Sequence, residues 1–136
     1  MPFIDEIAAW LVGEGVGALG STIFKTSSAA IPQGSGPYLS IRDTGGTGAV
    51  RTQNDTPTER PTAQLMSFAN NVTDSIRMST AAYNALGGAK GLFNVRLSGV
   101  FYLSITARQM PTDSGKDATG LKATYSFNID AEKEPS

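Results

Sequence analysis

The sequence predicts an α+β protein, in which a single, mostly antiparallel sheet of about five strands carries two helices packed on one face. Three observations lead to this fold class. The last third of the chain alternates apolar and polar residues over two segments, 99–108 and 121–130, which a polar turn at 111–120 joins. Two further segments, 3–12 and 72–86, repeat apolar residues at spacings of three and four, as amphipathic helices do.

The first helix is predicted over residues 3–12, where apolar residues fall on one stripe and the glycines from Gly13 onward end the helix. Trp10 is expected to anchor this helix in the core or against the sheet. Short strands are predicted next, at 23–26 and at 38–42, and a turn rich in Gly and Pro separates them.

A long loop is predicted at residues 43–60, because this stretch is rich in Gly, Thr, Asn and Pro and has no apolar periodicity. We expect it to be mobile in the isolated subunit and to become ordered against a neighbour after assembly. Strand character resumes at 61–69. Residues 1–136 are expected to form one domain, with a flexible tail at 132–136.

The second helix is predicted to begin after Asn71, whose side chain can cap the first turn, with Asp74 where a carboxylate suits the positive helix end. Gly87 and Gly88 supply the stop signal, and a short connection at 89–97 leads to the closing strands. The helix face predicted to pack on the sheet consists of Val72, Ile76, Ser79, Thr80, Tyr83 and Leu86.

The two closing strands are predicted to turn one face to the helices and one to solvent or to a neighbour. The side chains expected to face the helices are Phe101, Leu103, Ile105, Tyr125, Phe127 and Ile129. The other face of the last strand is expected to carry Lys122, Thr124, Ser126, Asn128 and Asp130.

The amino-acid composition argues against a catalytic or metal-binding site. The chain has no His and no Cys, which excludes Ser-His-Asp and Cys-His nucleophiles and thiolate metal sites. Its net charge of −1 argues against non-specific attraction to nucleic acid, which needs a basic surface. No stretch approaches the ~20 apolar residues of a membrane span. We therefore expect that the protein is not an enzyme, binds no cofactor and contacts no membrane. We expect it to function through its surface and not through a reaction.

Three short motifs could suggest a chemical site. The Asp-Thr-Gly at 43–45 is the tripeptide of aspartic proteases, in which two Asp residues share a proton, and a dimer could supply two copies. Arg42 precedes it where such sites need an apolar strand end, and Asp and Gly favour turns for local reasons. A dimeric protease using Asp43 stays as a remote alternative. The glycine pattern at 15–20 follows a helix instead of a strand, and the turn at 111–120 lacks the closing Glu of an EF-hand.

Four segments carry a likeness to a known family. They are an Asp-Thr-Gly-Gly sequence at 43–46, an Arg-Pro strand at 59–68, a Pro-x-x-x-Gly-x-Asp turn at 111–117, and an aromatic strand at 125–129. In this order they resemble the tail terminator proteins of long-tailed bacteriophages, which are often labelled minor capsid proteins. The likeness covers residues 3–130.

The resemblance implies a homo-oligomer, a six-fold ring at the head-proximal end of the virion's tail, assembled in the host cytoplasm. Its implied partners are the tail tube protein and a head–tail connector or neck protein, and DNA would pass through the ring without sequence-specific binding. The residues expected at such contacts are Asp43, Thr44, Gly45, Gly46, Arg51, Arg60, Lys116, Asp117 and Lys122. Another head–tail connector or head-completion protein stays open as the alternative.

Overall fold

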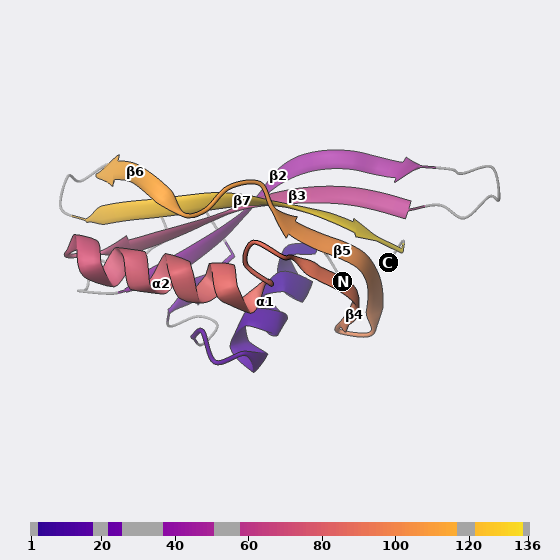
Figure 1. Cartoon of the computed structure of the whole chain (residues 1–136), viewed down its shortest axis with the longest axis horizontal. Helices are drawn as coiled ribbons and strands as arrows, with labels where there is room; N and C mark the ends of the chain where they lie inside the picture. Colours follow the sequence, from indigo (N-terminus) through magenta and orange to yellow (C-terminus); the bar gives the residue numbers. More distant parts are fainter. Residues whose placement is uncertain (1–2, 18–21, 26–36, 51–57, 117–121, 135–136) are drawn as a thin grey trace.

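The computed structural model describes residues 3–17, 22–25, 37–50, 58–116 and 122–134. Within these ranges, two helices, α1 (Phe3–Gly13) and α2 (Val72–Ala85), lie on one face of a seven-stranded sheet (Figure 1). The α+β class with a single, mostly antiparallel sheet is confirmed, and the sheet has more strands than the sequence predicts.

The central strand of the sheet is the last one. The strands are β1 (Ile23–Phe24), β2 (Tyr38–Val50), β3 (Thr58–Ala69), β4 (Leu92–Leu97), β5 (Val100–Ala107), β6 (Thr112–Lys116) and β7 (Ala123–Lys133). Hydrogen-bonded neighbours follow the order β1-β2-β3-β7-β5-β4, and β6 also pairs with β7. Only the β1–β2 pairing is parallel among these ladders. On one edge β7 pairs with β3, and on its other edge β5 and β6 share its length.

Two segments expected to be irregular are strands. The connection expected at 89–97 contains β4, and the polar turn expected at 111–120 contains β6. β6 pairs Thr112 with Ser126 and Lys116 with Ala123, along the part of β7 that β5 does not reach. Neither segment shows a clear alternation of apolar residues. Each is a strand because its backbone pairs with the strand that follows it in the chain, β4 with β5 and β6 with β7.

The long loop predicted at 43–60 is wrong. β2 continues to Val50 and β3 begins at Thr58, so most of this stretch belongs to a hairpin whose distal half extends past both helices (Figure 1). A strand that no helix covers does not need an apolar face, so the alternation on which the strand prediction depends is absent. Residues 51–57, which include part of the expected mobile segment, lie outside the described residues.

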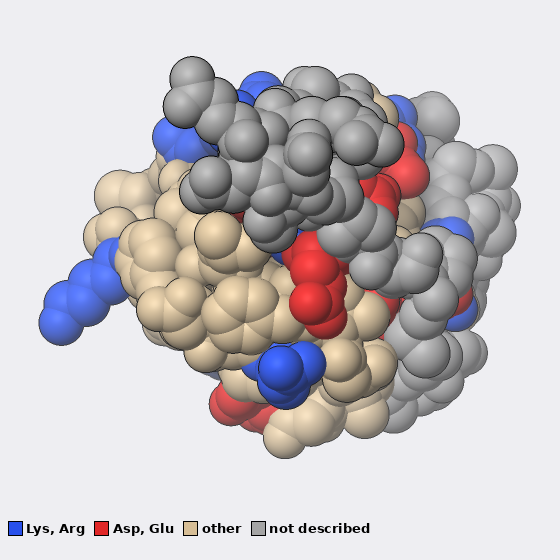
Figure 2. Space-filling model, turned by 90° about the vertical axis from the view of Figure 1, so that its right-hand side faces the viewer, with Lys and Arg blue, Asp and Glu red and all other residues tan. Residues whose placement is uncertain are grey.

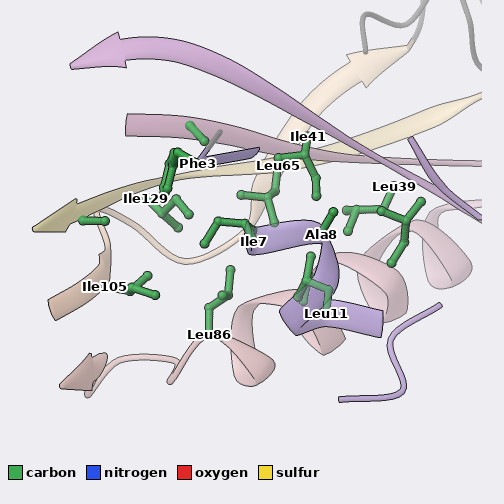
Figure 3. Close-up of a cluster of buried hydrophobic side chains, with 14 of the residues drawn as sticks. Phe3, Ile7, Ala8, Leu11, Leu39, Ile41, Leu65, Leu86, Ile105 and Ile129 are labelled. Carbon is green, nitrogen blue, oxygen red and sulfur yellow. The ribbon is translucent and has the colours of Figure 1, made fainter. Parts of the chain in front are cut away.

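The core lies between the helices and the inner face of the sheet. Side chains of α1 point toward Leu39 and Ile41 of β2 and Leu65 of β3 (Figure 3), and all three sheet residues are fully buried. Trp10 is half-buried and donates its indole N–H to the Ala85 carbonyl at 2.8 Å, so it ties α1 to the end of α2. Full burial of such aliphatic side chains stabilises the fold by about 1.5–3 kcal/mol each.

The second helix begins as predicted, but a different face packs on the sheet. Asn71 accepts a hydrogen bond from the Asp74 amide at 2.8 Å. The buried residues of α2 are Ser75, Met78, Ser79 and Ala82. Val72 and Ile76 are 51% and 40% exposed and Thr80 is exposed too, so the predicted face is wrong at these three positions. Ser79 and Leu86 are buried as predicted. This face also makes a polar contact with the sheet, since the hydroxyl of Ser67 on β3 donates to the Ser75 carbonyl at 2.7 Å.

β5 departs from simple alternation. Tyr102 and Ile105 are its fully buried residues, whereas Leu103 is 38% exposed, so the expected inward position of Leu103 is wrong. The β5–β7 register shifts between Tyr102 and Ser104, and this irregularity resets which side chains face inward. On β7, the inward positions of Phe127 and Ile129 are confirmed, whereas Tyr125 is half-buried and does not belong to the core cluster. Thr124 and Ser126, which were expected on the outer face, are buried.

The flexible tail predicted at 132–136 is wrong for its described residues. β7 runs to Lys133, whose ammonium lies 2.8 Å from a carboxylate oxygen of Glu6 in α1, and both side chains are buried. The Tyr102 hydroxyl donates to the same oxygen. Burial, followed by the hydrogen bond and the charge of Glu6, raises the pKa of Tyr102, so the tyrosine stays a neutral donor. A buried ion pair therefore joins the two ends of the chain.

Candidate interaction surface

The face of the sheet turned away from the helices is polar, and we call it the polar face. It contains a hollow of about 800 Å³. The residues that line the hollow are Thr44, Arg60, Thr62, Ser104, Thr106, Arg108, Asn128, Asp130, Ala131 and Glu132. They come from β2, β3, β5 and β7 and from the residue that follows β5, so the hollow spans four neighbouring strands.

Strand register brings these residues together. Thr62 of β3 lies opposite Asp130 of β7, and Thr106 of β5 lies opposite the same Asp130 from the other side. Ser104 lies opposite Glu132. Cross-strand partners share a face, and residues two apart on a strand share it too, so one pairing register fixes the whole set.

Two ion pairs define the charge of the polar face. The Arg108 Nε donates to both carboxylate oxygens of Asp130, at 2.8 and 2.9 Å. This hydrogen bonding, together with the carboxylate charge, raises the pKa of Arg108. Arg60 lies 3.8 Å from Glu132. All four side chains are substantially exposed, so the pairs add little to stability and instead set a pattern in which each cation stands beside an anion.

The end of the molecule that carries the C-terminus shows the same balance. In Figure 2 the blue and red side chains of the described residues are interspersed, with no broad field of one sign. A surface of this kind suits a polar, hydrated protein contact better than attraction to a polyanion.

Of the Asp-Thr-Gly sequence, only Thr44 lines the hollow, and the tripeptide lies in an irregular part of β2. The Asp43 carboxylate is exposed and accepts a hydrogen bond from the Gly45 amide at 2.7 Å. Gly45 has a φ of 99°, which favours glycine, and the β2–β3 register shifts here. Thr44 contacts Thr62 through their hydroxyl oxygens at 2.7 Å. The hydrogen bond between Asp43 and Gly45 is therefore the local contact that Asp residues commonly make in turns.

The structure brings some of the expected contact residues together. Thr44 and Arg60 line the hollow, and Gly45 and Gly46 pair with Thr62 and Pro61 in the hairpin. Asp43 pairs with the core residue Ala63, so its side chain lies on the other face of the sheet. Arg51, Asp117 and the side chain of Lys116 lie outside the described residues, although the Lys116 backbone belongs to β6.

Lys122 was expected on an exposed surface, and this prediction is wrong. Its side chain is only 3% exposed. The ammonium donates to the Asn70 side-chain oxygen at 3.3 Å and lies 5.8 Å from the centre of the Tyr38 ring. The long aliphatic stem lets Lys122 lie against the aromatic ring while its charge keeps polar contacts.

The sequence does not predict that the charged residues of the hollow come together as a group. The alternation of the last strand places Asn128 and Asp130 on the outer face, and this placement agrees with their contribution to the hollow. Arg108 is the last residue of the predicted strand at 99–108, and only tertiary pairing brings it to Asp130. Glu132 lies in the segment predicted to be a flexible tail, 132–136.

The described residues hold no group of three or more His, Cys, Asp or Glu side chains that could bind a metal ion. Among the described ranges, neither helix has the length and apolar character required to cross a membrane.

Comparison with known proteins gives a structural likeness without a sequence match. No family model matches this chain, and no curated protein matches it. Among solved structures, the fold is similar to a chain of a structure described as the virion of a native gene transfer agent (GTA) particle. The match covers 92% of this chain and 84% of that chain, with a TM-score of 0.61 and 13% sequence identity. At this identity the likeness shows a shared fold.

Proposed function

We propose that this chain is a structural protein of a phage-like virion and that it acts there as a tail terminator. The observation that carries the proposal is the fold likeness to a chain of a virion particle, which extends over 92% of this chain. The resemblance to tail terminators at 43–46 and 111–117 supplies the more specific position, the head-proximal end of the tail.

In the proposed role, six copies form a ring that occupies the growing end of the tail tube and so stops the addition of tube subunits. The ring then offers its other side to a connector or neck protein of the head. The charge-balanced polar face supports this role, because protein contacts that form during assembly are commonly polar and hydrated. The distal half of the β2–β3 hairpin also supports it, since it extends past the helices where a partner can reach it.

Electron microscopy of a lysate from a phage that lacks this gene tests the role. We expect filled heads and separate tails of excessive or uneven length, because the stop is lost while tube subunits remain. Tails of normal length beside heads that have lost their DNA would contradict the terminator role and favour a head-completion protein.

Complementation of the same mutant tests the polar face. Arg108→Ala is expected to reduce head–tail joining at least tenfold, because it removes the bidentate partner of Asp130. Arg77→Ala is the matched control, since Arg77 is an exposed arginine paired with Asp74 on α2 and away from the polar face. Equal joining by the two variants would remove the polar face from the proposal.

The alternatives differ in their support. A head-completion protein would also use the fold and the polar face, so the length of the tails separates it from a terminator. A dimeric protease would need Asp43 as a shared-proton acid, and the exposed carboxylate bound to Gly45 gives that role no support.

A further inference from the structure

β4 ends the sheet with an open edge. It pairs only with β5 among the described residues, and it lies last in the strand order. Its sequence, Leu92–Leu97, contains no Pro, and Phe93 is 56% exposed. Its one charged residue, Arg96, donates to the Gly99 carbonyl and lies near Glu134 of the same molecule, and Asn94, with a φ of 55°, interrupts the regular pairing at one point. Edge strands of stable monomers are usually protected by charges, prolines or a covering element, so this edge is suited to pairing with another strand.

A small groove lies beside the end of this edge. Its volume is about 250 Å³, and its lining residues are Ala9, Trp10, Gly13, Glu14, Leu97 and Ser98. When a strand is added to a sheet edge, backbone hydrogen bonds hold it and a neighbouring pocket receives one of its side chains. β4 offers both features together.

Among the described residues, the opposite end of the sheet offers a second open edge. β1 pairs with β2 only at Leu39 and Ser40, so the outer edge of β2 from Ile41 onward has no strand partner among the described residues. Arg42 lies on this part of β2, exposed on the polar face, where its guanidinium donates to Gln64 at 2.8 Å.

The two edges carry complementary side chains on the same face. Phe93 lies opposite Ser104, which lines the hollow of the polar face, so its ring is on the polar face as well. Arg42 lies on that face at the far end of the sheet. An exposed ring and an exposed guanidinium attract each other through a cation–π contact. Two different patches at opposite ends of one subunit suit head-to-tail contacts, which close into a ring.

We propose that the outer edge of β4 receives the outer edge of β2 from a second copy of this chain, with Phe93 of one copy against Arg42 of the next. The sheets of neighbouring subunits then join edge to edge, and the polar face continues from one subunit to the next. This inference rests on the ring of the proposed function and names the contact that builds it.

Cysteine cross-linking tests the contact without background, because the chain has no cysteine of its own. Purified Phe93→Cys and Arg42→Cys variants are mixed and oxidised. Within one chain β3, β7 and β5 separate the two positions, roughly 19 Å of sheet, and a disulfide needs Cα atoms within about 7 Å. A covalent dimer in the mixture is therefore the expected result, and the double variant should give a ladder up to a closed ring.

Val72→Cys mixed with Arg42→Cys is the matched control, because Val72 is similarly exposed but lies on α2. A dimer formed by Phe93→Cys alone would overturn the inference, since it requires β4 to pair with β4. A ring detected by native mass spectrometry of the unmodified protein, without cross-links in the mixture, would overturn this contact and leave the proposed function intact. Absence of any ring, in solution and in virions, would instead overturn the proposed function.

Discussion

At the scale of single residues, Glu6 has the environment that is hardest to read from sequence. It stands among polar positions of an amphipathic helix, yet its side chain is fully buried and holds the ammonium of Lys133 and the hydroxyl of Tyr102. A buried carboxylate is costly unless it is paired, and these two donors, both on Oε1, offset part of that cost, while Oε2 has no hydrogen-bond partner among the described residues. Each of them is therefore expected to matter to stability.

Replacing Tyr102 by Phe tests the buried cluster through pH. The variant should lose about 1–3 kcal/mol at neutral pH, because Glu6 loses a donor. The raised pKa of Tyr102 adds stability that is complete below the unfolded value of about 10 and is lost as the pH rises further. We expect the difference between native protein and variant to shrink above about pH 10, measured by urea unfolding. A difference that stays constant at alkaline pH would contradict this assignment.

A pair of substitutions on β5 tests the irregularity between Tyr102 and Ser104. Ile105→Ala removes a fully buried side chain and should cost about 2–5 kcal/mol of unfolding free energy. Leu103→Ala, in the same strand, should cost less than about 1 kcal/mol, because Leu103 is partly exposed. Thermal or denaturant unfolding measures both. Equal costs would show that Leu103 is packed in the core, as simple alternation predicts.

At the scale of elements, the structure turns expected irregular segments into strands. β6 and the distal parts of β2 and β3 have polar or glycine-rich sequences, and backbone pairing with a neighbour holds them. β7 is the element on which this depends, since β3, β5 and β6 all pair with it. Because β7 is long, β5 and β6 can both pair along the same edge of it.

Truncation tests the last part of β7. Removal of residues 132–136 deletes Lys133 and leaves the buried Glu6 without its cation, so we expect a loss of about 3–5 kcal/mol. Removal of the last two residues is the control and should leave stability unchanged. Chemical unfolding of both variants gives the comparison. Equal unfolding midpoints would mean that residues 132–134 do not stabilise the fold, as the prediction of a flexible tail implies.

At the scale of the whole molecule, charge balance is the property that most restricts function. The net charge is −1, and the arginines of the hollow stand beside carboxylates. We expect the isolated subunit to show no measurable binding to duplex DNA at about 150 mM salt, followed by fluorescence anisotropy of a labelled duplex. Binding that weakens steeply as salt rises would contradict this expectation and reveal an unbalanced basic surface.

The candidate surface could be predicted only in part. Alternation along the last strand placed Asn128 and Asp130 on the outer face, and both line the hollow. The same alternation placed Lys122 there, but this residue is buried beside Tyr38 and Asn70. Alternation reports which way a side chain points, and it does not report what another part of the chain lays over it.

The features that depend on neighbours along the chain could be predicted from the sequence. These are the two helices with the Asn71 cap, the α+β class, the strands that became β5 and β7, and the lack of His and Cys. The folded structure decides the features that depend on pairing between segments: the sheet order, the β6–β7 and β2–β3 pairings, and the burial of Glu6 with Lys133. Those two residues stand 127 positions apart. A local pattern cannot signal such a pair, because the stabilising partner enters only when the sheet has formed.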